Sequence, residues 1–181
     1  MATRWLVVLS VTLAVACGAV APAAQQRAPD VQYEPTPPEV VNAMLDLAGV
    51  RAGDVVYDLG CGDGRIPIEA VRRGARGVCV DIDLQRIAEA RVNARNAGVE
   101  ERITFRHEDL MATDLREATV VTLFLSARLN DRLHPKLVKE LRPGSRVVSH
   151  WHTMSRWKPE KSITVKSRQR DEHALFFWTV P

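Results

Sequence analysis

The 181-residue sequence lacks the features of repetitive, fibrous and disulfide-rich proteins. It has no internal repeat with a period of about 20 to 50 residues and no heptad run, which excludes solenoids, propellers and coiled coils. Cysteine is scarce: besides Cys17 there are only Cys61 and Cys79, which we expect in a glycine turn and a buried strand, so no disulfide framework is predicted. Hydrophobic residues make up 46% and charged residues 26% of the chain, as in one ordinary globular domain.

One long uncharged segment lies at the N-terminus. Residues 1–4 end with the basic Arg4, residues 5–24 contain no charged side chain, and polar residues follow. This order is typical of a secretory signal, so we predict a signal peptide or N-terminal anchor over residues 1–24 and a linker over residues 25–35. The most apolar part, residues 5–16, is shorter than the roughly 17 to 25 residues that span a membrane.

Three fates of this segment are open from the sequence. Small residues at Ala21 and Ala23 favour cleavage after Ala23 or Ala24, while Cys17 is a poor lipoprotein site and an uncleaved anchor is the third alternative. Each of them predicts an exported domain, periplasmic or secreted, with possible membrane association through residues 5–24.

Charge is distributed unevenly along the chain. Residues 25–130 contain 13 basic and 17 acidic side chains, whereas residues 131–181 contain 11 basic and 5 acidic ones. The C-terminal third therefore predicts a basic surface, either simply solvated or attractive to an acidic protein or an anionic membrane. Because no aromatic residues alternate with the basic ones and no nucleic-acid motif is present, we expect no nucleic-acid partner.

Strand and helix patterns alternate over residues 36–181, which we predict to form one domain. Thr36, followed by two prolines and Glu39, resembles a capping box at the start of the first helix. Further helices are expected over residues 65–73, 84–97 and 131–141, and strands over residues 54–59, 77–80, 103–105, 120–125, 144–149, 163–166 and 174–180. Because the last two strands have no helix between them, the pattern predicts a three-layer α/β sandwich with an antiparallel strand at its C-terminal end.

A glycine-rich turn follows the first predicted strand. It contains Asp58, Gly60, Cys61, Gly62 and Gly64. Glycines allow positive φ angles and a close approach of backbone to ligand at this edge of an α/β sheet. The spacing is not that of a dinucleotide fingerprint, because Arg65 stands where the third glycine of that motif would be needed.

Three carboxylates follow three successive predicted strands. Asp58 suits a ligand with an ammonium group, Asp81 suits the hydroxyls of a ribose, and Asp109 suits an exocyclic adenine amine. Each of them separately is also a common cap or turn residue. Together with the glycine turn they predict a site for a nucleoside that carries a positive charge and no phosphate.

Residues 55–65 and 77–83 resemble the first two motifs of class I S-adenosylmethionine-dependent methyltransferases. Residues 33–36, 62–66 and 157–159 are more narrowly similar to small enzymes related to the mitochondrial lysine methyltransferases of the ATP synthase c subunit and the adenine nucleotide translocase. The resemblance implies a Rossmann-like seven-strand sheet, S-adenosylmethionine as cofactor, and Tyr33 and Thr36 over the cofactor.

The catalytic residues and the acceptor are less well marked. The segment after the fourth strand, residues 124–128, lacks the Asn/Asp-Pro-Pro-aromatic motif of enzymes that methylate bases or amides, which leaves protein lysine, small amines and hydroxyls. His150 and His152 would point to opposite faces of an extended chain and have no matching cluster, so no metal site is predicted. We expect protein-lysine N-methylation first; small-molecule methylation and non-catalytic S-adenosylmethionine binding are the alternatives.

Overall fold

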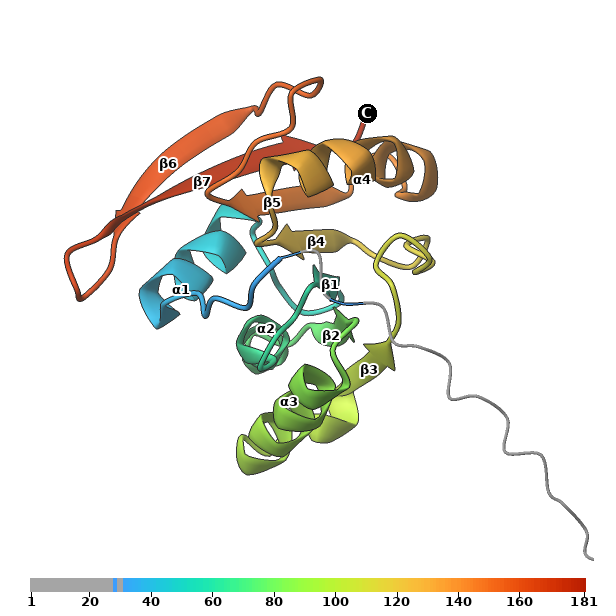
Figure 1. Ribbon diagram of the computed structural model, residues 1–181, viewed down its shortest axis with the longest axis vertical. Helices are drawn as coiled ribbons and strands as arrows, with labels where there is room; N and C mark the ends of the chain where they lie inside the picture. The colour runs from blue at the N-terminus through green and yellow to red at the C-terminus, as the bar shows by residue number, and fades with distance from the viewer. Residues whose placement is uncertain (1–27, 29–30) are drawn as a thin grey trace, which may run out of the picture.

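The computed structural model describes residue 28 and residues 31–181, and the predicted N-terminal leader lies outside them. One seven-stranded sheet with the strand order β3-β2-β1-β4-β5-β7-β6 runs through the molecule (Figure 1). The elements in chain order are α1 (Pro38–Leu47), β1 (Val55–Leu59), α2 (Arg65–Arg72), β2 (Arg76–Asp81), α3 (Leu84–Asn96), η1 (Glu100–Arg102), β3 (Ile103–His107), β4 (Val120–Leu123), α4 (Ala127–Glu140), β5 (Arg146–His150), β6 (Lys161–Lys166) and β7 (Glu172–Thr179).

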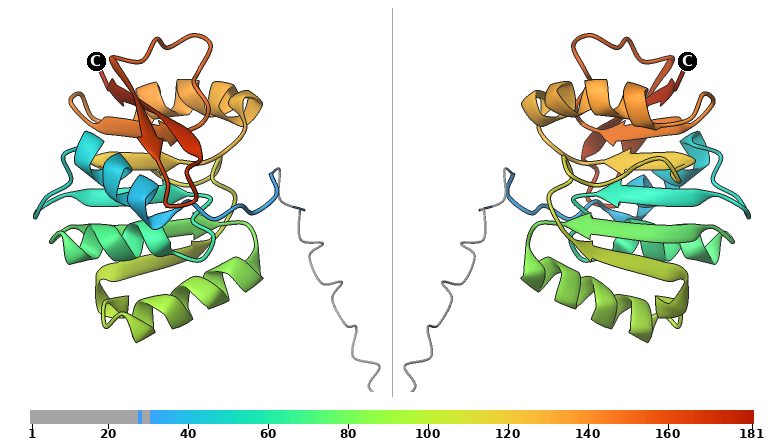
Figure 2. Two further views of the ribbon diagram at one scale, coloured as in Figure 1. Left: turned by 90° about the vertical axis from the view of Figure 1, so that its left-hand side faces the viewer. Right: turned by 90° about the vertical axis from the view of Figure 1, so that its right-hand side faces the viewer.

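The sheet is parallel from β3 to β5, and β7 pairs antiparallel with both β5 and β6. Helices α1, α2 and α3 cover one face, and α4 covers the other (Figure 2). This confirms the predicted three-layer α/β sandwich with antiparallel strands at its C-terminal end.

Strand β1 lies inside the sheet between β2 and β4, and all five of its residues are buried. Its alternate side chains pack on opposite faces of the sheet: Val56 lies in the hydrophobic cluster under α1, whereas Tyr57 and Leu59 lie in the cluster under α4. A parallel strand that is covered on both faces is largely apolar, which is why its sequence shows no polar alternation, and Asp58 is its one charged residue.

The predicted capping box is wrong. Helix α1 begins at Pro38, with Pro37 at the N-cap position, and no side chain caps it. Thr36 is buried and its Oγ1 lies 3.3 Å from Nδ1 of His150. The carboxylate of Glu39 pairs instead with Nε of Arg168 at 2.7 Å. Both side chains therefore have partners distant in sequence that a local motif cannot reveal.

Helix α4 begins four residues before the predicted start at residue 131. Ser126 is its N-cap residue, and its Oγ accepts a hydrogen bond from the backbone N–H of Leu129 at 3.3 Å. Val138 of this helix is 42% exposed. The early start of α4 brings its first turn next to the end of β4.

No disulfide framework is predicted from the sequence, but Cys61 and Cys79 are bonded to each other. The backbone N–H groups of Gly60 and Cys61 both donate to the carbonyl of Val80, at 2.8 and 3.0 Å. These bonds turn the chain back over β2 after β1 ends, and they bring Cα of Cys61 to 5.2 Å from Cα of Cys79.

Removing this disulfide is expected to lower the free energy of unfolding. A crosslink that closes a loop of 18 residues contributes about 3 kcal/mol in the chain-entropy description. The double variant Cys61→Ala, Cys79→Ala should therefore unfold at a lower urea concentration than the oxidised protein, as followed by circular dichroism. Wild-type protein treated with reductant is the control and should approach the variant; equal midpoints for the variant and the oxidised wild type would contradict the prediction.

Candidate active site

A cavity of about 430 Å³ opens where the carboxyl ends of β1, β2 and β4 meet. Its walls come from the segment before α1, the turn after β1, the end of β2, the loop after β3 and the start of α4. The predicted site residues that line it are Thr36, Asp58, Gly60, Cys61, Asp81 and Asp109. Gly62 and Gly64 lie in the same turn but outside the lining.

Gly62 has a structural reason to be glycine. Its φ angle is +54°, and a Cβ atom at this position would lie 2.3 Å from Cε2 of Tyr33. Gly64, the N-cap residue of α2, lies close to Ala90 of α3. These two glycines therefore shape the turn, while Gly60 and Cys61 form the wall of the cavity.

Asp58 is the buried carboxylate of the cavity. It is 3% exposed, and the Thr122 hydroxyl donates a hydrogen bond of 2.8 Å to its Oδ1. Burial, together with the negative charges of Asp81 and Asp63, raises the pKa of Asp58 to about 7 against the lowering effect of the Thr122 hydrogen bond. An ionised Asp58 is costly without a cation, so a positively charged ligand group is the partner that this position favours.

Asp81 connects two segments of the wall through its carboxylate. Its Oδ2 accepts the N–H of Gly62 at 2.9 Å, and its Oδ1 accepts the N–H of Asp83 at 2.9 Å. Each carboxylate oxygen can accept a second hydrogen bond. The side chain thus holds the glycine turn in place and still offers acceptors to the cavity.

Asp109 lies on the loop after β3. Its Oδ1 accepts the N–H of Met111 at 2.9 Å, and the preceding residue, Glu108, donates its N–H to the carbonyl of Asp81 at 3.1 Å. This last bond draws the loop toward the end of β2. The three carboxylates predicted from successive strands therefore line one cavity.

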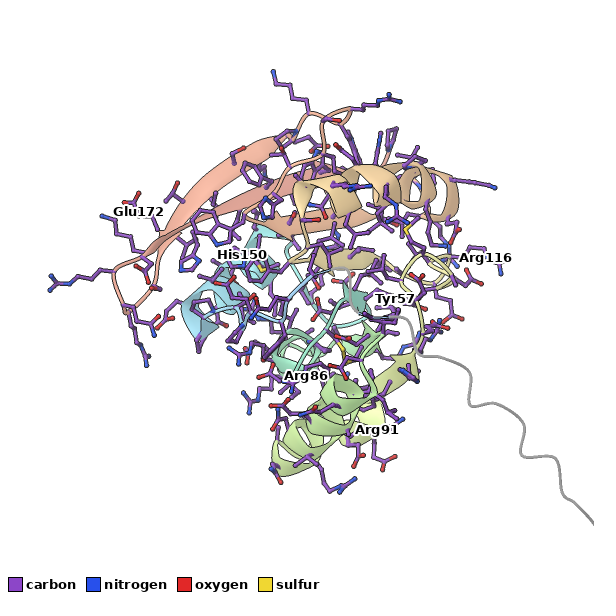
Figure 3. The ribbon with its side chains drawn as sticks, viewed as in Figure 1. Tyr57, Arg86, Arg91, Arg116, His150 and Glu172 are labelled. Atoms are coloured by element: carbon purple, nitrogen blue, oxygen red, sulfur yellow. A yellow bond between two sulfur atoms is a disulfide. The ribbon has the colours of Figure 1, made fainter. Side chains whose placement is uncertain are left out.

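The segment before α1 is the part of the wall that strand and helix patterns do not reveal. Residues 31–36 all line the cavity. The ring of Tyr33 lies over Gly62, and the guanidinium of Arg86, which Figure 3 labels, lies 4.7 Å from the centroid of that ring. Arg65 donates a 2.7 Å hydrogen bond to the carbonyl of Thr36. The family resemblance at residues 33–36 was the sequence signal that could place this segment at the site. The polar composition of the segment indicates only a linker.

A buried histidine pair joins the end of β5 to β7, and Figure 3 labels one member of it, His150. Nε2 of His150 lies 2.9 Å from Nδ1 of His173, and the ring of His150 contacts that of Phe124 with centroids 4.0 Å apart. Burial lowers the pKa of His150 to about 3, with His173 and His152 adding to the effect. His150 is therefore neutral at physiological pH, and Phe124 and Thr36 present this apolar, uncharged side to the cavity.

Residues 58–161 match the ANTKMT methyltransferase domain. The chain belongs to this methyltransferase family. The match covers the glycine turn, all three carboxylates and the start of α4. It confirms the predicted class I S-adenosylmethionine-dependent methyltransferase, with the narrower resemblance to the lysine methyltransferases.

Three relatives of this ANTKMT-family chain define the similarity. A protein-lysine N-methyltransferase of Saccharolobus islandicus is 43% identical over 154 residues, which are 84% of this chain and 95% of that protein. The adenine nucleotide translocase lysine N-methyltransferase of Mus musculus is 34% identical over 120 residues, which are 66% of this chain and 52% of that protein. The lysine N-methyltransferase of the ATP synthase c subunit from Xenopus laevis is 29% identical over 147 residues, which are 81% of this chain and 64% of that protein.

A solved structure agrees with the same assignment. The crystal structure titled an RNA methyltransferase from Salinibacter ruber, in complex with S-adenosyl-L-homocysteine, is 46% identical, with a TM-score of 0.77. The similarity covers 82% of this chain and 94% of that one. The solved structure therefore supports the methyltransferase fold and S-adenosylmethionine as the cofactor, in agreement with the ANTKMT-family match.

The prediction of an exported domain is wrong. The relatives named above are methyltransferases of protein lysines, of the adenine nucleotide translocase and of the ATP synthase c subunit, and none of them is described as an exported protein. Within residues 31–181, no helix is both long and apolar enough to cross a membrane.

Proposed function

We propose that this chain transfers a methyl group from S-adenosylmethionine to the ε-amine of a protein lysine. The observation that carries the proposal is the near full-length match to the protein-lysine N-methyltransferase of S. islandicus. The cavity supports it, because its lining combines carboxylates and a glycine turn with uncharged side chains such as Phe124, Leu125 and Leu129.

The residues of the cavity fit the cofactor. Asp58 would hold the ammonium of its amino acid part, Asp81 the ribose hydroxyls and Asp109 the adenine amine, with Gly60 and Cys61 as the backbone wall. Gly62 and Gly64 would act through the shape of the turn, and Thr36 through the cavity wall. When bound, the cofactor would supply a sulfonium-bound methyl group, to which the amine nitrogen would bond in line as the C–S bond breaks and S-adenosylhomocysteine leaves.

The chain's own contribution to the reaction is to orient the amine and to favour its neutral form. A lysine ammonium must lose a proton before its nitrogen can attack, and a site that excludes water lowers its pKa. Phe124 and Thr36, supported by the neutral ring of His150, form such a side of the cavity. No charged general base is required at this position, because desolvation already favours the neutral amine.

The ribose assignment predicts the effect of Asp81→Ala. Loss of charge-assisted hydrogen bonds should weaken S-adenosylmethionine binding by roughly 1–3 kcal/mol, and the N–H groups of Gly62 and Asp83 should lose their acceptor. Calorimetric titration measures the affinity. Asp114→Ala is the comparison, because it removes an exposed carboxylate that does not line the cavity; unchanged affinity in Asp81→Ala would contradict the assignment.

The acceptor class is tested with labelled cofactor. Full-length protein is incubated with methyl-labelled S-adenosylmethionine and either lysine-containing proteins, an RNA pool or small amines, and the labelled product is hydrolysed. We expect label in methylated lysine, and none with the Gly60→Val variant. Label only in small amines, or cofactor binding without transfer to any acceptor, would overturn the lysine proposal.

RNA methylation is the second candidate, and one observation favours it. The solved structure that is 46% identical is titled an RNA methyltransferase. The same assay separates the two candidates, because label would then appear in nucleosides and not in lysine.

A further inference from the structure

We propose that a groove on the outer side of α4 binds an acidic stretch of the polypeptide that carries the acceptor lysine. This inference rests on the proposed lysine methylation and adds to it the class of partner sequence. The groove, called the basic groove below, has a volume of about 840 Å³ and is lined by four cations: Arg128, Arg132, Lys139 and Arg156.

The basic groove is built by contacts between α4 and the loop after β5. The backbone N–H of Ser155 donates to Oδ1 of Asp131 at 2.5 Å. The rings of His134 and Trp157 pack with centroids 5.3 Å apart. These two contacts fix Arg156 opposite the helix and engage the only carboxylate that lines the groove within the described part of the chain.

The four cations are available to a partner. All four are exposed, and none forms an ion pair within the part of the chain that the structure describes. Lys136 of the same helix, in contrast, is paired with Glu140 at 2.7 Å and does not line the groove. Exposed cations grouped without partners create a positive potential that attracts an anionic surface.

The length and floor of the groove suit a polypeptide. Arg128 and Lys139 are eleven residues apart on one helix, a distance of about 16 Å at 1.5 Å per residue, which corresponds to about five residues of extended chain. The exposed side chains of Pro135 and Val138 add an apolar floor between the cations. Among residues 31–181, no Trp, Tyr or Phe lines the groove, whereas binding of single-stranded nucleic acid relies on aromatic stacking.

The groove also begins beside the cavity. Leu129 lines the cavity, and the adjacent Arg128 lines the groove on the exposed side of the same helical turn. α4 forms the outer layer of its face of the sheet, so this stripe is open to a partner (Figure 2). An acidic segment seated in the groove would therefore hold the chain near the point where the lysine must enter.

The test compares labelled peptides that contain one lysine and either four Glu or four Gln residues, placed at several spacings from the lysine. Fluorescence anisotropy measures their binding to the full chain, and methyl transfer is followed separately. We expect the Glu peptide to bind at least about 10-fold more tightly than the Gln peptide. This preference should disappear in the double variant Arg128→Glu, Arg132→Glu, and also for the wild-type protein at high salt.

The matched control is the double variant Arg51→Glu, Arg76→Glu, because both residues are exposed and line neither the groove nor the cavity, and Arg76 begins β2, at the end of that strand opposite the cavity. It should keep the preference, and both double variants should keep wild-type S-adenosylmethionine affinity and melting temperature. Equal binding of the Glu and Gln peptides to wild type, equal loss in both double variants, or tighter binding of a single-stranded RNA in the groove would overturn the proposal. Since anisotropy needs no turnover, binding of the Glu peptide without methyl transfer would count against the proposed function and not against the groove.

Discussion

Asp58→Asn is expected to weaken S-adenosylmethionine binding by roughly 10- to 100-fold, the value of a hydrogen bond to a charged group, and at the same time to stabilise the ligand-free protein. The carboxylate is buried, 3% exposed, and its pKa is raised to about 7. The folded protein therefore bears the cost of an ionised, desolvated group above that pH. Asn keeps the shape of the side chain and removes the charge.

The pH dependence of this prediction has a definite sign. Because the folded pKa of Asp58 lies above its ordinary value of 3.8, its contribution to stability is fully present below that value and is lost as pH rises to about 7. At pH 8 the Asn variant should gain roughly 2–4 kcal/mol relative to wild type. Cofactor affinity has the opposite trend, since the ammonium binds the carboxylate: wild-type affinity should rise with pH up to about 7, and that of the variant should not.

Calorimetric titration and thermal melts at pH 6 and pH 8 measure both effects. Asp171→Asn is the matched control, because it removes one exposed carboxylate in the loop between β6 and β7. If Asp58→Asn bound S-adenosylmethionine with wild-type affinity at pH 8, Asp58 would not be the partner of the ammonium group.

Gly60→Val is expected to abolish measurable cofactor binding. Gly60 has a φ angle of +86° and lines the cavity, and a Cβ atom would lie 3.1 Å from Cδ2 of Leu125. A branched side chain would therefore fill space that the ligand needs, and the left-handed backbone would add strain of about 1–2 kcal/mol. The melting temperature should fall moderately, whereas affinity should be lost.

Gly144→Val separates steric blocking from backbone strain. Gly144 has a nearly equal φ angle of +83°, but no atom lies within 4 Å of its Cβ position, and it does not line the cavity. The control variant should lose stability to a similar extent and keep its affinity for S-adenosylmethionine. Equal affinity of the two variants, measured by calorimetry, would contradict the role of Gly60 as a wall of the site.

The sheet and the three carboxylates were predictable because they follow from local patterns. Continuous apolar residues predicted β1 and β2, and the carboxyl ends of parallel strands meet at one edge, which brings Asp58, Asp81 and Asp109 to one cavity. The glycine turn was also recognisable, since its spacing is short and its residues are contiguous.

Contacts across the chain were not predictable in the same way. The bond between Cys61 and Cys79 depends on how the turn folds back over β2, and the Thr36 contact with His150 spans 114 residues. Thr36 and Glu39 also match a local capping motif, so the sequence pattern favoured the wrong partners. The basic groove lies partly in the C-terminal third that composition marked as basic, but its placement depends on the loop at Ser155 and Arg156.

The wall formed by residues 31–36 sets the boundary of the functional unit. These residues belong to no helix or strand, yet all six line the cavity. A shortened chain that started at Pro37 would retain the whole sheet and all four α-helices but would have an open site. Fixing each backbone residue costs roughly 1–2 kcal/mol of conformational entropy, so a ligand that contacts this segment shares in ordering it. We therefore expect the N-terminal border of the catalytic unit to be set by the ligand site and not by secondary structure.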